Sequence, residues 1–106
     1  MRNYYEHKVV WITGASSGIG AALALQLAKF DLKLVISARR EQELIEIKDQ
    51  CKALPANIFV LPFDLMELDS FQNVVDRVIE KFGSIDVLFN NGGISQRSTV
   101  KETPLP

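Results

Sequence analysis

Short apolar runs alternate with longer amphipathic stretches along the chain, and this alternation predicts its secondary structure. Each short run is continuous and ends at polar residues or glycine, as in strands that are buried on both faces of a sheet. The longer stretches repeat apolar residues at helical spacing, which is typical of helices with one buried face. Strands are therefore predicted over residues 9–12, 34–36, 58–61 and 85–89, and helices over 19–30, 41–53 and 69–82.

The order of these elements predicts an α/β fold built on a parallel sheet. Strand and helix alternate three times before the last strand, and parallel neighbours are joined by right-handed helical crossovers. In a doubly wound sheet this order places the strands as 3-2-1-4, with further strands beyond the fourth. We therefore expect a Rossmann-type domain over residues 1–106 that is truncated after its fourth strand. A domain of this class without a ligand site would give the same pattern, so the turns must decide the function.

Composition and charge exclude several function classes. The 12 Lys and Arg residues against 13 Asp and Glu residues give a net charge of −1, so no basic surface for nucleic acid is expected. No apolar run approaches the roughly 20 residues that span a bilayer, and we expect no membrane partner. Cys51 is the only cysteine, which excludes an intrachain disulfide and a thiolate metal cage and favours a reducing, cytoplasmic location.

A glycine-rich turn between the first strand and the first helix is the strongest candidate site. Gly14 allows a backbone conformation that a Cβ would block, Gly18 removes bulk where a ligand approaches, and Gly20 lets the helix lie close to the sheet. The start of the helix offers N–H groups and the positive end of its dipole to a pyrophosphate, although a tight turn without a ligand is the alternative. The residues predicted to hold the pyrophosphate are Gly14, Ser16, Ser17, Gly18, Ile19 and Gly20.

Three short strings resemble motifs of the short-chain dehydrogenase/reductase superfamily. TGASSGIG at residues 13–20 is similar to its cofactor fingerprint TGxxxGxG, and NNGG at residues 90–93 is similar to its NNAG. Phe63-Asp64-Leu65 after the third strand is similar to its acidic adenine contact. The longer stretch NNGGISQRS resembles the branch called dehydrogenase/reductase family member 7.

The resemblance implies a nicotinamide dinucleotide and assigns contacts beyond the glycine turn. It implies that Asp64 accepts a hydrogen bond from the adenine amino group and that the backbone of Leu65 lies beside it. An Asp64 that only caps the following turn is the alternative. The resemblance further implies that the backbone of Asn90 contacts the ribose side of adenosine, with Asn91 and Gly92 in the same motif.

The end of the second strand favours NADP(H) over NAD(H). An NAD pocket usually has an acid there, about 20 residues after the first glycine, but residues 35–39 contain none. The same absence counts against a methyltransferase that uses adenosylmethionine. A guanidinium can bind a 2′-phosphate through two charge-assisted hydrogen bonds, so we predict Arg39 as the main phosphate contact and Arg40 as its neighbour. The alternative is a solvated pair compensated by Glu41 and Glu43.

The resemblance implies an oxidoreductase whose catalytic residues lie outside these 106 residues. In the family a Tyr transfers the proton, a Lys raises its acidity, and a Ser and an Asn assist; none of them is assigned in this chain. Tyr4 and Lys8 match the Tyr–Lys spacing but precede the first strand. We expect the cofactor-binding half of an NADP(H)-dependent carbonyl reductase or alcohol dehydrogenase, acting on a small-molecule carbonyl or alcohol as a homo-oligomer. The alternative hypothesis is a noncatalytic dinucleotide-binding module that works through a partner chain.

Overall fold

Four parallel strands form a sheet in the computed structural model, which describes residues 5–16, 18–51, 55–64 and 71–91. All three pairs of neighbouring strands are parallel. The predicted α/β fold with strand order 3-2-1-4 is confirmed. The strands are β1 (Val9–Thr13), β2 (Lys33–Ser37), β3 (Ile58–Val60) and β4 (Val87–Asn90), in the order β3-β2-β1-β4.

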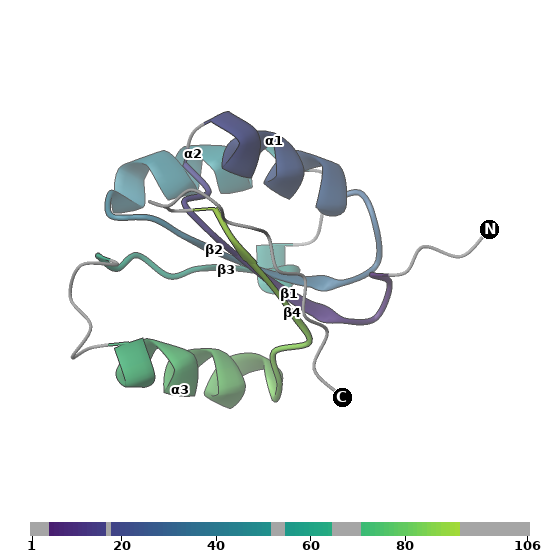
Figure 1. The fold of residues 1–106 in the computed structure, drawn as a ribbon. Coiled ribbons are helices and arrows are strands. Elements are labelled where there is room, and N and C mark those ends of the chain that lie inside the picture. Colours follow the sequence, from purple (N-terminus) through teal and green to yellow (C-terminus); the bar gives the residue numbers. More distant parts are fainter. Residues whose placement is uncertain (1–4, 17, 52–54, 65–70, 92–106) are drawn as a thin grey trace.

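Helices cover both faces of this sheet (Figure 1). Two helices, α1 (Gly18–Leu27) and α2 (Glu41–Gln50), lie on one face, and α3 (Phe71–Phe82) lies on the other. A short 3-10 helix, η1 (Pro55–Asn57), precedes β3. The arrangement has the three layers of a doubly wound fold.

The sheet divides the hydrophobic core into two layers. Alternate residues of β1 point to opposite faces, so Val10 and Ile12 pack in the layer of α1 and α2, whereas Val9 and Trp11 pack in the layer of α3. Every residue of β1 is buried. This explains why the strand reads as a continuous apolar run rather than as an alternating one.

The first helix differs from its prediction at both ends. It ends at Leu27 instead of residue 30, because the chain tightens there into turns in which Lys29 and Phe30 donate to carbonyls three residues back. The predicted helical stretch begins at Ile19 and ends at Phe30, but these two apolar residues are 77% and 37% exposed. Ile19 lies in the first turn of α1.

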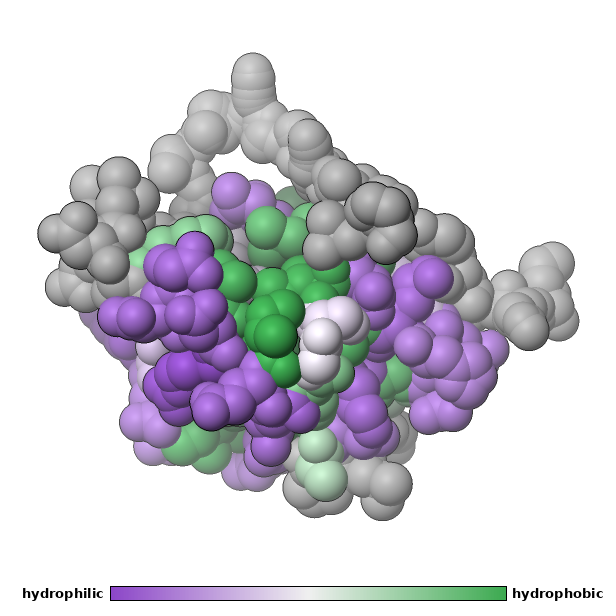
Figure 2. Space-filling view, turned by 90° about the horizontal axis from the view of Figure 1, so that it is seen from below, coloured by the Kyte–Doolittle hydropathy of each residue, from purple (hydrophilic) through white to green (hydrophobic). Residues whose placement is uncertain are grey.

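Smaller differences occur in the other elements. α2 ends one residue before Cys51, so this cysteine follows the helix instead of lying in it. On α3, the apolar residue Ile79 is 42% exposed, and Figure 2 shows apolar surface among polar side chains on the face that carries this helix. β4 begins at Val87, two residues later than predicted. The predicted helical residues 52–53 and 69–70 lie outside the described ranges.

Candidate cofactor-binding site

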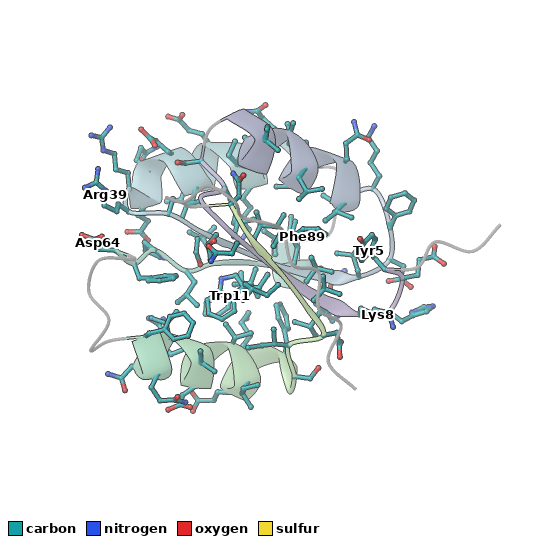
Figure 3. The ribbon with its side chains drawn as sticks, in the orientation of Figure 1. Tyr5, Lys8, Trp11, Arg39, Asp64 and Phe89 are labelled. Carbon is teal, nitrogen blue, oxygen red and sulfur yellow. The ribbon has the colours of Figure 1, made fainter. Side chains whose placement is uncertain are left out.

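The carboxyl ends of the strands meet at one edge of the sheet, which we call the carboxyl edge. Thr13 of β1 is in register with Ser37 of β2 and with Asn90 of β4, so these strands end at the same level. Arg39 and Asp64 both lie at this end of the sheet, on the left in Figure 3. Ligands of doubly wound sheets bind outside this edge, and those predicted cofactor residues that the structure describes gather there.

The glycine turn, residues 13–20, connects β1 to α1 at the carboxyl edge. Gly14 and Gly18 have φ angles of 67° and 56°, a region that strains a residue with a Cβ. The N–H of Ala15 donates to the Ser37 carbonyl at 3.0 Å, which ties the turn to β2. A Cβ on Gly18 would meet no heavy atom within 4 Å, and the first turn of α1 contains no acidic residue. The turn therefore fits an anionic group such as a pyrophosphate.

Gly20 allows α1 to rest directly on the start of the turn. A Cβ at this position would overlap the carbonyl oxygen of Gly14 and lie 2.7 Å from Asn91 Nδ2. This is the close approach of helix and sheet for which the sequence analysis predicted a glycine.

Two asparagines at the end of β4 hold the first strand and the turn in place: Asn90 is the last residue of the strand and Asn91 follows it. Thr13 Oγ1 donates to Asn90 Oδ1 at 2.9 Å, and Asn91 Nδ2 donates to the Gly14 carbonyl at 3.2 Å. The backbone N–H of Asn91 also donates to the carbonyl of Thr13 at 3.2 Å. Both asparagines are predicted cofactor contacts, but their roles in shaping the turn could not be predicted from the motif. Their position at the end of β4, which pairs with β1, is the signal that could have indicated these roles.

The two arginines after β2 have different surroundings. The Arg40 guanidinium lies 3.3 Å from a carboxylate oxygen of Glu43, and the two side chains are 71% and 42% exposed. Arg39 is also exposed, but it makes no ion pair with any residue in the described ranges. The alternative of compensation by a glutamate therefore holds for Arg40, whereas Arg39 pairs with no carboxylate in the described ranges.

Asp64 is carried to the carboxyl edge by the continuation of β3. The N–H of Leu61 donates to the Ile36 carbonyl and the N–H of Phe63 donates to the Ala38 carbonyl, both at 3.0 Å. The chain thus stays paired with β2 beyond the last residue of β3, and Asp64 follows at the level of Arg39. The predicted contacts that lie outside the described residues are Ser17, Leu65 and Gly92.

The described part of the chain offers no competing chemistry. None of its His, Cys, Asp and Glu side chains form a group of three that could hold a metal ion. Burial raises the pKa of the Cys51 thiol, which keeps the thiol protonated and poorly reactive at neutral pH. Lys8 lies at the opposite end of the sheet from Arg39 (Figure 3), and Tyr4 is outside the described residues.

Comparison with known proteins identifies the family. Residues 8–105 match the family model for short chain dehydrogenases. The chain belongs to the short-chain dehydrogenase family. It is 52% identical over 101 residues to the mouse protein "Dehydrogenase/reductase SDR family member 7", an alignment that covers 92% of this chain and 30% of the mouse protein. The chain therefore spans about a third of the length of this relative.

Solved structures of short-chain dehydrogenases share the fold. A short chain dehydrogenase from Bacillus anthracis superposes with a TM-score of 0.76 at 39% identity, over 80% of this chain and 34% of that one. The L-sorbose reductase from Gluconobacter frateurii, solved with NADPH and L-sorbose, gives 0.73 at 32% identity, over 90% of this chain and 36% of that one. The resemblance to the superfamily and to its member 7 branch is confirmed, and the family is one of oxidoreductases. In the described ranges, no helix has the length and apolar character of a membrane span.

Proposed function

We propose that the chain binds NADP(H) at the carboxyl edge and forms the cofactor-binding part of a short-chain oxidoreductase that acts on a small-molecule carbonyl or alcohol. The observation that carries the proposal is the setting of Arg39. It lies at the same edge as the glycine turn, it is exposed, and it makes no ion pair within the described ranges. A carboxylate at this place would repel a 2′-phosphate, whereas a guanidinium can bind it bidentately.

In this proposal the glycine turn holds the pyrophosphate through backbone N–H groups. The open space at Gly18 and the absence of acid from the first turn of α1 support this role, because nothing opposes an anion at the positive end of the helix dipole. Ser16 and Ser17 add hydroxyl donors. Ile19 lies beside the cofactor, consistent with a side chain that is 77% exposed in the free chain.

The adenosine half of the cofactor is proposed to lie at the ends of β2 and β3. Arg39 binds the 2′-phosphate, and Arg40 joins it by leaving its ion pair with Glu43. Asp64 accepts a hydrogen bond from the adenine amino group. Once bound, NADP(H) supplies or accepts a hydride at its nicotinamide ring. The remaining proposed contacts are Gly14, Gly20, Leu65, Asn90, Asn91 and Gly92.

The proposal also covers the source of the catalytic residues, the oligomeric state and the cellular location of the protein. The Tyr, Lys and Ser of the family are proposed to come from sequence outside these 106 residues, which agrees with a chain that covers 30% of its mouse relative. We also propose that the oxidoreductase is a homo-oligomer. The proposed cytoplasmic location rests on the single cysteine.

Calorimetric titration of the purified protein with NADPH and NADH tests the cofactor assignment. We expect NADPH to bind more tightly. Arg39→Asp should abolish this preference, because a charge-assisted contact is worth about 1.5–3 kcal/mol, or roughly 10-fold to 150-fold in affinity. Lys29→Asp is the matched control, since it makes the same charge change at an exposed position beyond α1.

The possible outcomes separate the parts of the proposal. Folded wild-type protein that binds neither coenzyme would overturn the proposed function. A preference for NADPH that persists in Arg39→Asp would remove Arg39 from the phosphate site while leaving dinucleotide binding intact.

A further inference from the structure

A buried polar contact lies beneath the strand ends that carry the proposed adenosine site. Trp11 and Ser37 are each 1% exposed, and the indole Nε1–H of Trp11 donates to Ser37 Oγ at 2.8 Å. Trp11 is in register with Val35, so its side chain reaches along one face of the sheet to the last residue of β2. Figure 3 shows Trp11 between the sheet and α3.

Ser37 connects this contact to the rest of the carboxyl edge. Its hydroxyl oxygen accepts from Trp11, while its carbonyl accepts from the N–H of Ala15 in the glycine turn at 3.0 Å. Arg39 follows only two residues later. A shift of Ser37 would therefore move both the turn and the start of the segment that carries Arg39.

The same indole contacts the continuation of β3 beyond its last residue and the first residue of α3. Its ring centroid lies 6.1 Å from that of Phe63 in an edge-on arrangement, and 6.1 Å from that of Phe71 with the planes inclined by 6°. Phe63 immediately precedes Asp64, and Phe71 is the first residue of α3. Aromatic contacts of this kind hold rings in fixed relative positions. Trp11 thus contacts the ends of both strands that lead to Arg39 and Asp64.

A hydrogen bond is not required to fill this space, because phenylalanine could supply the aromatic packing alone. A buried indole N–H without a partner is costly, however, so the Ser37 hydroxyl selects one orientation of the indole. That orientation in turn sets where Phe63 packs. The pair is therefore suited to fixing the distance between the two strand ends, in addition to stabilising the fold.

We propose that Trp11 and Ser37 are positioning residues, whose buried hydrogen bond sets the spacing of Arg39 and Asp64 and thereby the affinity for the phosphorylated adenosine half of NADP(H). The inference rests on the proposed function, because it assigns these residues to the same site. Neither side chain touches the cofactor in this scheme. Each acts through the backbone of the strand end that it holds.

Calorimetric titration with 2′,5′-ADP tests the inference, because this probe contains the adenosine and its 2′-phosphate but no nicotinamide. Trp11→Phe and Ser37→Ala each remove the hydrogen bond from one side. We expect each to weaken binding by about threefold to tenfold, the range that one lost hydrogen bond explains. The double variant should be no weaker than the weaker single variant, because both changes remove the same contact.

Val78→Ala is the control for a loss of stability without a change in the site. Val78 is fully buried in the same core layer, two turns along α3 from Phe71. Its truncation should lower the melting temperature but leave the affinity of the folded protein for 2′,5′-ADP unchanged. Ser37→Ala leaves the buried indole N–H of Trp11 without an acceptor, whereas Trp11→Phe removes that N–H. Trp11→Phe is therefore the variant expected to fold even if Ser37→Ala does not.

Trp11 emission supplies a second measurement that a purely structural role would not affect. Trp11 is the only tryptophan, and 2′,5′-ADP neither absorbs nor emits at the wavelengths of its fluorescence. We expect saturating 2′,5′-ADP to change the emission of the wild type. If folded Trp11→Phe binds 2′,5′-ADP as tightly as wild type, the positioning role is wrong while the proposed function stands. If wild type binds neither 2′,5′-ADP nor NADPH, both fail together.

Discussion

Gly20→Ala tests how closely α1 approaches the glycine turn. The added Cβ would overlap the carbonyl oxygen of Gly14 and lie 2.7 Å from Asn91 Nδ2 and 3.0 Å from Ala15 Cα. Two of these three neighbours are backbone atoms, so rotation of a side chain cannot relieve the overlap. Either α1 or the turn must move.

Two opposing effects set the size of the change. Alanine favours the helix over glycine by about 1 kcal/mol, whereas an extra atom forced into packed surroundings costs about 1–3 kcal/mol. Overlap with a carbonyl oxygen lies at the upper end of that range. We therefore expect Gly20→Ala to lower the free energy of unfolding by about 1–2 kcal/mol. NADPH binding should weaken as well, because the displaced segment is the proposed pyrophosphate site.

Urea unfolding followed by Trp11 fluorescence measures this change, since the tryptophan is buried in the folded protein. Ala22→Gly, at an exposed position of α1, is the matched control. It should lose about 1 kcal/mol through helix propensity alone and leave NADPH binding unchanged. A Gly20→Ala protein as stable as wild type, with the same NADPH affinity, would refute the argument that α1 rests on Gly14.

Two further predictions concern residues away from the carboxyl edge. His7 has a φ of 68°, a conformation that strains a residue with a Cβ by about 1–2 kcal/mol. In the same urea assay, His7→Gly should therefore be more stable than His7→Ala. The reverse order of stability would contradict the strain. The exposed contact of His7 with Asp31 is lost in both variants, so it does not affect this comparison. Burial raises the pKa of the Cys51 thiol, so the folded state holds the thiol proton more tightly than the unfolded state does. The resulting contribution to stability is fully present below the pKa of the unfolded state's thiol. It is lost as the pH rises through the pKa of the folded state's thiol. Wild type should therefore lose stability relative to Cys51→Ala as the pH rises from neutral through that range, whereas a difference in unfolding free energy that is constant with pH would exclude this linkage.

The fold could be predicted because burial constrains the sequence at every strand. Val9 to Ile12 are apolar on both sides of the chain since β1 is covered by helices on both faces. Crossover rules then restrict the order of parallel strands. The same reasoning fails at Ile19, because helical spacing indicates which residues share a face but not whether each of them meets a packing partner. Ile19, in the first turn of α1, is 77% exposed.

The candidate site could be predicted only in part. The glycines of the turn and Arg39 can be recognised in the sequence, because the backbone conformation of the glycines and the charge of Arg39 matter within their own short segments. The contacts of Asn91 with Gly14 and of Trp11 with Ser37 depend on the register between different strands. β1 and β2 are buried on both faces, so their sequences lack the alternation of apolar and polar residues that would help to fix this register. Tertiary contacts of this kind therefore had to come from the structure.

The partners of the glycine turn have a consequence for how the protein is made. The side chains of Asn90 and Asn91 bond to Thr13 and Gly14, which were synthesised 77 residues earlier. Contacts of such high sequence separation form slowly, because a long loop must close before they are gained. On the ribosome, a nascent chain that has not yet produced β4 already contains all three turn glycines but lacks the bonds that fix them. The proposed nucleotide site thus gains these bonds only once the fourth strand has docked.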